Sequence, residues 1–272
     1  MRVALIQVAS PDTEQVRERV DRVGGMVSEA ASKGAQLVVL PELWSSGYFA
    51  FGRYEELAEA IDGEITLAMS RWALECGVQL LGGSFVERSR NSDLHNTAVL
   101  FDKSGMLVHT YRKMHVFGYQ SLEAALLKPG KTIGVVDSDF WTFGTTTCYD
   151  LRFPEIYRLL VDQGAQAVLV PAAWPAARLP HWILLTQARA LENQVFVLAC
   201  NAVGEQAGVE LAGHSRVIDP WGEVLAEAGS GEEILMCDID LGRVDEVRSE
   251  FPVLEDRRLF VNSDVQDTGG KK

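Results

Sequence analysis

The chain has few of the residues that build disulfides or metal centres. Only four cysteines occur among 272 residues, at positions 76, 148, 200 and 237. They form no CxxC pair and have no metal-type spacing. The five histidines, at 95, 109, 115, 181 and 214, are scattered along the chain, which argues against a metallohydrolase. We therefore expect free thiols, no metal centre, and a cytoplasmic location.

Long apolar runs and an excess of positive charge are also missing. No apolar stretch approaches the roughly 20 residues that span a bilayer, and residues 1–8 have the pattern of a strand rather than of a secretion signal. The 25 Lys and Arg residues are outnumbered by 38 Asp and Glu residues, a net charge of −13. This balance argues against a nucleic-acid surface. We therefore expect no nucleic acid as a partner and, because no apolar run is long enough, no membrane.

The chain does contain alternating strand-like and helix-like segments, with no low-complexity linker between them. We predict one domain over residues 1–262 and a polar tail over 263–272 that is disordered. Hairpin turns are predicted at 102–105 and 219–222. Helices are expected at 14–32, 65–76, 154–163 and 181–193, and strands at 2–8, 37–40, 79–86, 97–102, 108–111, 132–136, 141–147, 167–170, 195–201, 214–218 and 234–240. This pattern predicts an α/β protein with mixed sheets covered by helices.

An internal repeat gives the first functional candidate. Residues 34–44 are GAQLVVLPELW and residues 164–174 are GAQAVLVPAAW, identical at six of eleven positions. Each copy follows a helical pattern and has the apolar run of a buried strand, so we predict one αβ unit used twice and two sheets packed face to face. Glu42 in the first copy corresponds to Ala172 in the second. Because the fold accepts Ala there, Glu42 is predicted to serve chemistry; the alternative is a strand-end carboxylate in water.

Cys148 is the second candidate. It lies in TTTCYDLRFPE, after a β-rich segment and five residues before a predicted helix start at Phe153-Pro154-Glu155. A thiol between a strand end and a helix N-terminus can have a lowered pKa, and the thiolate is a nucleophile. The alternative interpretation is a small buried hydrophobic residue.

Lys113 completes a set that carries a family resemblance. Alone it is an ordinary lysine at a strand end. Glu42 in LPELW, Lys113 in YRKMHVFG and Cys148 in CYDLRFPE, however, occur in this order at separations of 71 and 35 residues. The chain resembles the nitrilase superfamily of carbon–nitrogen hydrolases with its Glu–Lys–Cys triad, and the resemblance extends from residue 4 to residue 254. It implies a four-layer αββα sandwich and a homodimer.

The resemblance also implies a reaction. Cys148 would attack an amide carbonyl to form a thioester, and Glu42 would transfer the protons. Lys113 and the backbone N–H of Tyr149 would stabilise the oxyanion. Glu123 matches a second family glutamate that orients Lys113; alternatively it is a loop carboxylate that only pairs with this lysine. No cofactor is implied.

The substrate is less sharply indicated. The segments AAWPAAR (172–178) and ARALENQ (188–194) are similar to the bacterial ω-amidase-like branch, which acts on terminal amides of short dicarboxylates. Arg178 is the candidate for binding the substrate carboxylate, or else a rim arginine paired with a surface acid. The predicted pocket walls are Tyr48, Phe117, Tyr119, Tyr149 and Trp174.

Three alternatives stay open. Within the enzymes, the chain could be an N-carbamoyl amidohydrolase or a nitrilase, because these branches share the triad. Ala202 and the loop 118–122 differ from the ω-amidase pattern. Outside the enzymes, the chain could be a catalytically silent scaffold of the same fold. A Ser-His-Asp hydrolase is not favoured, since no G-x-S-x-G motif occurs.

Overall fold

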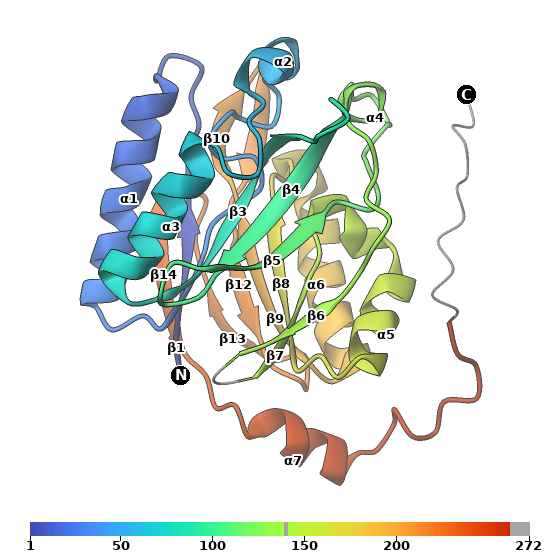
Figure 1. Ribbon diagram of the computed structural model, residues 1–272. Helices are drawn as coiled ribbons and strands as arrows, with labels where there is room; N and C mark the ends of the chain where they lie inside the picture. The colour runs from blue at the N-terminus through green and yellow to red at the C-terminus, as the bar shows by residue number, and fades with distance from the viewer. Residues whose placement is uncertain (139–140, 262–272) are drawn as a thin grey trace.

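Two six-stranded sheets lie face to face between two layers of helices (Figure 1). The computed structural model describes residues 1–138 and 141–261. The first sheet has the order β14-β1-β2-β3-β4-β5, formed by Glu233–Asp238, Arg2–Gln7, Leu37–Val39, Gln79–Arg88, Leu94–Phe101 and Leu107–Arg112. The second has the order β13-β12-β9-β8-β7-β6, formed by Val224–Glu227, Arg216–Ile218, Phe196–Asn201, Ala167–Ala172, Thr142–Thr145 and Val135–Asp137.

Helices cover the outer face of each sheet. α1 (Val16–Ser32) and α3 (Glu64–Cys76) cover the first sheet, and α5 (Pro154–Asp162) and α6 (Leu179–Asn193) cover the second (Figure 1). The short helices are η1 (Phe51–Arg53), α2 (Tyr54–Leu57), α4 (Glu123–Leu126), η2 (Cys148–Arg152), η3 (Ala176–Arg178) and α7 (Arg243–Glu250). The predicted αββα sandwich is therefore confirmed.

The two sheets repeat one topology. In the first, β1, β2 and β3 are parallel, β4 and β5 continue antiparallel, and β14 pairs antiparallel with β1. In the second, β7, β8 and β9 are parallel, β12 and β13 continue antiparallel, and β6 pairs antiparallel with β7. The repeated sequence forms β2 and β8, which hold equivalent places, so the predicted double use of one αβ unit is confirmed.

Alternation along β2 explains why its whole apolar run is buried. Leu37 and Val39 face the core between the sheets, whereas Val38 faces the core beneath α1 and α3. Successive side chains of a strand point to opposite faces, and a strand covered on both faces is apolar throughout. The carboxyl ends of β2 and β8 thus emerge from the centre of the molecule, where Glu42 and Ala172 lie.

Three strands, the last helix and the short helices η1, α2, α4, η2 and η3 were not predicted from the sequence. β10 (Val203–Gln206) and β11 (Val209–Ala212) form a separate hairpin, in which Ala207 and Gly208 both have positive φ. Such turns usually carry Asn-Gly, so Ala-Gly gave no turn signal. β13 directly follows the turn predicted at 219–222 but was not itself predicted. α7 has only two apolar positions, Val244 and Val247, and hence no apolar stripe.

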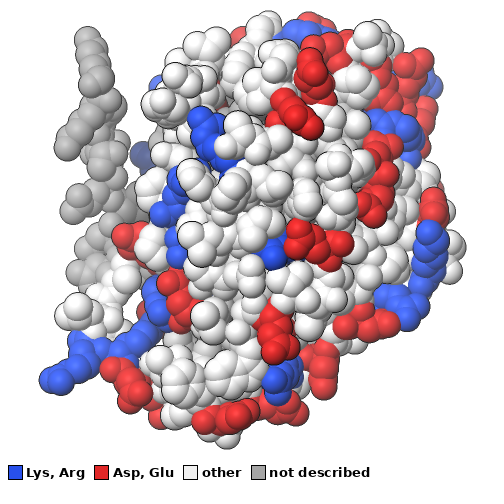
Figure 2. Space-filling view, turned by 180° about the vertical axis from the view of Figure 1, so that it is seen from behind, with Lys and Arg blue, Asp and Glu red and all other residues white. Residues whose placement is uncertain are grey.

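Acidic side chains are spread over the face seen in Figure 2, in line with the net charge of −13. Among the described residues, no helix has both the length and the apolar character needed to cross a membrane. The tail predicted over 263–272 lies outside the described residues.

A glycine in β3 allows the close approach that positions Glu42. The β3–β4 register shifts between Leu81 and Ser84, and Gly83 in this bulge has a φ of 65°. A Cβ at Gly83 would lie 2.0 Å from the carbonyl oxygen of Pro41. Ser84 then accepts a hydrogen bond from the N–H of Leu43 (3.0 Å). The bulge therefore fixes the backbone on both sides of Glu42.

We predict that Gly83→Ala lowers the free energy of unfolding by about 1–3 kcal/mol, because the new methyl group overpacks the Pro41 carbonyl at a positive φ. Urea unfolding measures this change. Gly25→Ala is the matched control: Gly25 lies within α1 with open space around its Cβ position, so stability should rise by at most about 1 kcal/mol. Equal effects at the two sites would contradict the prediction.

Candidate functional site

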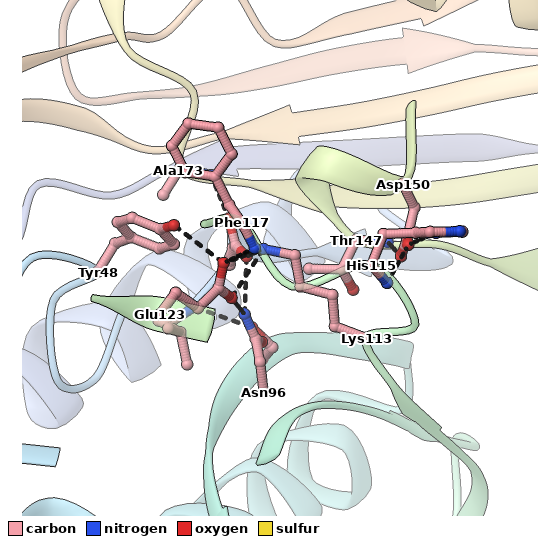
Figure 3. A network of polar contacts seen from close by, with 12 residues as sticks. Tyr48, Asn96, Lys113, His115, Phe117, Glu123, Thr147, Asp150 and Ala173 are labelled. Atoms are coloured by element: carbon pink, nitrogen blue, oxygen red, sulfur yellow. Dashed lines mark hydrogen bonds and ion pairs between the residues drawn. The ribbon is translucent and has the colours of Figure 1, made fainter. Parts of the chain in front are cut away.

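Three charged side chains from distant parts of the chain meet in the interior (Figure 3). Glu42 follows β2, Lys113 follows β5 and Glu123 begins α4. The Lys113 Nζ lies 2.8 Å from Glu42 Oε1 and 2.8 and 2.9 Å from the two oxygens of Glu123. All three side chains have 0% exposure. The alternative of a solvent-facing Glu42 is therefore wrong.

Glu42 is held by three groups. Besides Lys113, Asn96 donates from Nδ2 to Glu42 Oε1 (2.7 Å), and the backbone N–H of Ala173 donates to Glu42 Oε2 (2.9 Å). Asn96 also donates to Glu123 Oε1 at 3.1 Å. The sequence analysis missed Asn96; the available signal was an amide side chain just before an apolar strand-like run.

Glu123 has its own set of donors. Tyr48 Oη donates to Glu123 Oε2 (3.0 Å), and so does the backbone N–H of Phe117 (2.8 Å). Both oxygens also accept from Lys113. Glu123 is thus more than a loop carboxylate with one partner, because it joins the lysine to two segments that line the cavity described below.

Burial and charge set the protonation of this group. Burial raises the pKa of Glu42, and the charge of Glu123 adds to this effect against the opposing charge of Lys113. Burial alone would lower the pKa of Lys113, but Glu123 and Glu42 raise it well above its ordinary value. The lysine therefore stays an ammonium ion, while Glu42 is a carboxylate that accepts a proton more readily than an exposed one.

Cys148 begins η2 with a φ of 46° and is 7% exposed. Its thiol interacts with Glu42 and with the backbone N–H of Ala173. The expectation of a lowered thiol pKa is wrong: burial and then the negative charge of Glu42 raise the pKa of Cys148 well above its usual range, against the opposing charge of Lys113. The resting group is a neutral thiol, and it needs a base.

A cavity of ≈ 200 Å³ opens over Cys148. All five predicted aromatic wall residues (Tyr48, Phe117, Tyr119, Tyr149 and Trp174) line it, as does the predicted carboxylate ligand Arg178. The lining residues that sequence reasoning missed are Phe49, Gln120, Arg152, Ala173, Pro175, Ala177 and Val209. Val209 lies on the missed strand β11, and Arg152 follows Cys148 by four residues.

Two arginines in this lining have no acidic partner among the residues that the structure describes. The Arg178 guanidinium lies 5.6 Å from the ring centre of Phe117 and 5.9 Å from that of Tyr119. The Arg152 guanidinium lies 4.8 Å from the Trp174 ring centre, and its Nη2 is 3.1 Å from His181 Nδ1. The alternative of Arg178 paired with a surface acid finds no support within this part of the chain.

A resident metal finds no ligand set within residues 1–138 and 141–261. No three His, Cys, Asp or Glu side chains in these ranges are grouped so that they could hold an ion. The positive charge in the site comes from the Lys113 ammonium instead.

We predict that Glu42→Gln shifts the pH dependence of Cys148 alkylation by iodoacetamide to lower pH. The substitution removes the negative charge that raises the thiol pKa and leaves Lys113 in place. Mass spectrometry of each cysteine across a pH series measures the shift. Cys200, which is buried and has a pKa raised by burial, should stay unmodified in both proteins. An unchanged or higher midpoint would contradict the assignment.

Sequence comparisons identify relatives of this chain. The carbon–nitrogen hydrolase family model matches residues 2–249. The chain is 40% identical to a 2-oxoglutaramate amidase of Paenarthrobacter nicotinovorans (95% of this chain, 90% of the relative) and 37% identical to the human omega-amidase NIT2 (94% and 95%).

Solved structures of two further proteins resemble the fold of this chain. Saccharomyces cerevisiae Nit3, a member of the nitrilase superfamily, has a TM-score of 0.88 at 32% identity and covers 95% of this chain and 97% of its own. A mutant amidase from Nesterenkonia sp. AN1, which carries an acrylamide adduct on its active-site cysteine, has a TM-score of 0.80 at 27% identity, with 94% and 99% covered. The predicted resemblance is confirmed: the chain belongs to the carbon–nitrogen hydrolase family of the nitrilase superfamily.

Proposed function

We propose that this carbon–nitrogen hydrolase cleaves the terminal amide of a short dicarboxylate monoamide to a carboxylate and ammonia, through a thioester on Cys148. One observation carries the mechanism: a buried ammonium ion between two carboxylates lies beside a protonated thiol at a small cavity. This arrangement supplies a base, a nucleophile and a fixed positive charge at one place.

In the first half of the reaction, Glu42 takes the thiol proton as Cys148 Sγ attacks the amide carbon. The Lys113 ammonium and the backbone N–H of Tyr149 stabilise the oxyanion of the tetrahedral intermediate. Glu42 then gives its proton to the amide nitrogen, the C–N bond breaks, and ammonia leaves. The raised pKa of Glu42 suits both proton transfers, because it makes the carboxylate a stronger base toward the thiol, and the same group then returns the proton as an acid.

In the second half, Glu42 takes a proton from water, and the resulting hydroxide attacks the thioester carbon. The C–S bond breaks, the carboxylic acid product releases its proton to solvent and becomes a carboxylate, and the thiolate regains a proton from Glu42. Glu123 holds the Lys113 ammonium and Asn96 holds the Glu42 carboxyl group throughout, and Asn96 also donates to Glu123. No cofactor takes part in this scheme.

The substrate proposal rests on the two arginines. In a chain with a net charge of −13, a cavity with two guanidinium groups that have no acidic partner within residues 1–138 and 141–261 is suited to an anionic substrate. Arg178 is proposed as the main carboxylate ligand and Arg152 as a second. The names of the relatives, 2-oxoglutaramate amidase and omega-amidase, support the same class.

Three further proposals concern the chain as a whole. Residues 1–262 form one catalytic domain, since both sheets share one core. The protein works in the cytoplasm, where its four free cysteines stay reduced. It forms a homodimer, a proposal that the exposed Leu184 and Leu191 of α6 support; a light-scattering mass of a single chain would rule this out.

We predict ammonia release from succinamate or 2-oxoglutaramate, measured on the purified protein, and none from the Cys148→Ala variant, which lacks the nucleophile. A panel of simple amides, N-carbamoyl compounds and nitriles runs beside them. If the protein hydrolyses one of these classes but neither dicarboxylate monoamide, the proposed substrate class is wrong. Turnover of none would reject the proposed hydrolysis and favour the scaffold alternative.

We predict that Arg178→Ala raises KM for succinamate by about 10- to 100-fold, the loss expected for a charge-assisted hydrogen bond. The control substrate is butyramide, which lacks the carboxylate, and its KM should change less than about twofold. Arg152→Ala, measured in the same way, shows how much each of the two arginines contributes to binding the carboxylate. An equal rise for both substrates would mean that Arg178 shapes the cavity rather than binding the carboxylate.

A further inference from the structure

Asp150, two residues after Cys148, accepts four hydrogen bonds although its side chain is fully buried. Tyr111 Oη and the backbone N–H of Thr147 donate to Oδ2, at 2.7 and 2.9 Å. The backbone N–H of His115 and its ring Nδ1 donate to Oδ1, at 2.9 and 2.7 Å (Figure 3). A carboxylate only accepts, so Nδ1 of His115 carries the proton.

Three of these four donors belong to the segment that carries Lys113. Tyr111 precedes the lysine by two residues and His115 follows it by two. Tyr111 Oη also accepts a hydrogen bond from the backbone N–H of Met114 (3.2 Å). Residues 111–115 thus form a closed loop around the Asp150 carboxylate. One carboxylate on the nucleophile turn thus holds the backbone on both sides of the lysine.

The fourth donor belongs to the nucleophile turn itself. Cys148 has a φ of 46°, a left-handed conformation that costs a residue with a side chain about 1–3 kcal/mol and persists only where its surroundings hold it. The bond from the Thr147 N–H to Asp150 spans Cys148. Arg189 of α6 also donates to the carbonyl of Leu151 at 2.8 and 3.0 Å. The strained turn is therefore held on both sides.

We propose that Asp150 is a positioning residue that fixes the Cys148 thiol relative to the Lys113 ammonium by bonding the segments that carry them. This inference rests on the proposed function. Asp150 does not line the cavity, so it acts through these two residues and not by contact with the substrate. Displacement of reacting groups by about 1 Å costs on the order of 100-fold in rate, which is why one buried carboxylate at this junction controls turnover.

The test uses Tyr111→Phe, which removes one donor and keeps the packed ring, and Asp150→Asn as the stronger change. The matched control is Tyr157→Phe. It too removes a buried phenol hydrogen bond near Cys148, between Tyr157 Oη and Thr146 Oγ1 (2.8 Å), but one that does not reach the lysine segment. Two quantities are measured: kcat and KM for succinamate, and the rate of Cys148 alkylation by iodoacetamide.

We expect Tyr111→Phe to lower kcat by about 10- to 100-fold with KM within about twofold of the wild type, because binding stays intact while the reacting groups shift. Cys148 alkylation should be at least about threefold faster, because a released turn opens more often. Tyr157→Phe should change each value less than about twofold. Asp150→Asn should exceed Tyr111→Phe in both respects.

Equal kcat values for Tyr111→Phe and the wild type would overturn the proposal, and so would equal losses in Tyr111→Phe and Tyr157→Phe. If Asp150→Asn does not fold, Tyr111→Phe decides alone. Alkylation separates this inference from the proposed function: a wild type that hydrolyses no amide rejects the function, whereas unchanged alkylation in Tyr111→Phe rejects the positioning role.

Discussion

The structure depends on one buried charge cluster, the Lys113 ammonium between the carboxylates of Glu42 and Glu123. Taking these ions out of water is costly, and removing a single partner from such a group costs about 3–5 kcal/mol. The surrounding fold compensates with directed donors from four other residues: Asn96, Tyr48, and the backbone of Phe117 and Ala173. Because these come from both sheets and the loops between them, the two sheets must pack in one relative position for the cluster to form.

The same cluster explains why Cys148 is a thiol at rest. Two carboxylates and one ammonium already carry a net negative charge, so a thiolate would add a second unbalanced charge in a buried place. In the proposed reaction the nucleophile is therefore formed by proton transfer from Cys148 to Glu42, and the positive charge of the lysine remains available to the oxyanion. Activation here depends on the position of the groups rather than on a lowered thiol pKa.

Sequence reasoning reached the sandwich and the cluster because both depend on local patterns. The repeat predicted two equivalent strands, and the Glu42–Ala172 difference separated chemistry from fold. It failed where the signal lies in three-dimensional packing. The pKa of the Cys148 thiol depends on its burial beside Glu42. Asn96 is recognisable only from its contacts in the fold. The turn of the β10–β11 hairpin is an Ala-Gly pair, and nothing in these two residue types predicts a positive φ at both positions. Arg152 was missed because only the fold shows that it has no acidic partner among the described residues.

The two copies of the repeat contribute different groups to the site. The ends of β2 and β8 meet near the centre, where the N–H of Glu42 donates to the carbonyl of Ala172 (3.3 Å). The next residue of the second copy, Ala173, binds the Glu42 side chain. One copy thus contributes the ionisable group and the other the backbone dipole that holds it. Two identical halves would bring two carboxylates together at this junction, so the duplicated unit works only because its copies have diverged into complementary roles.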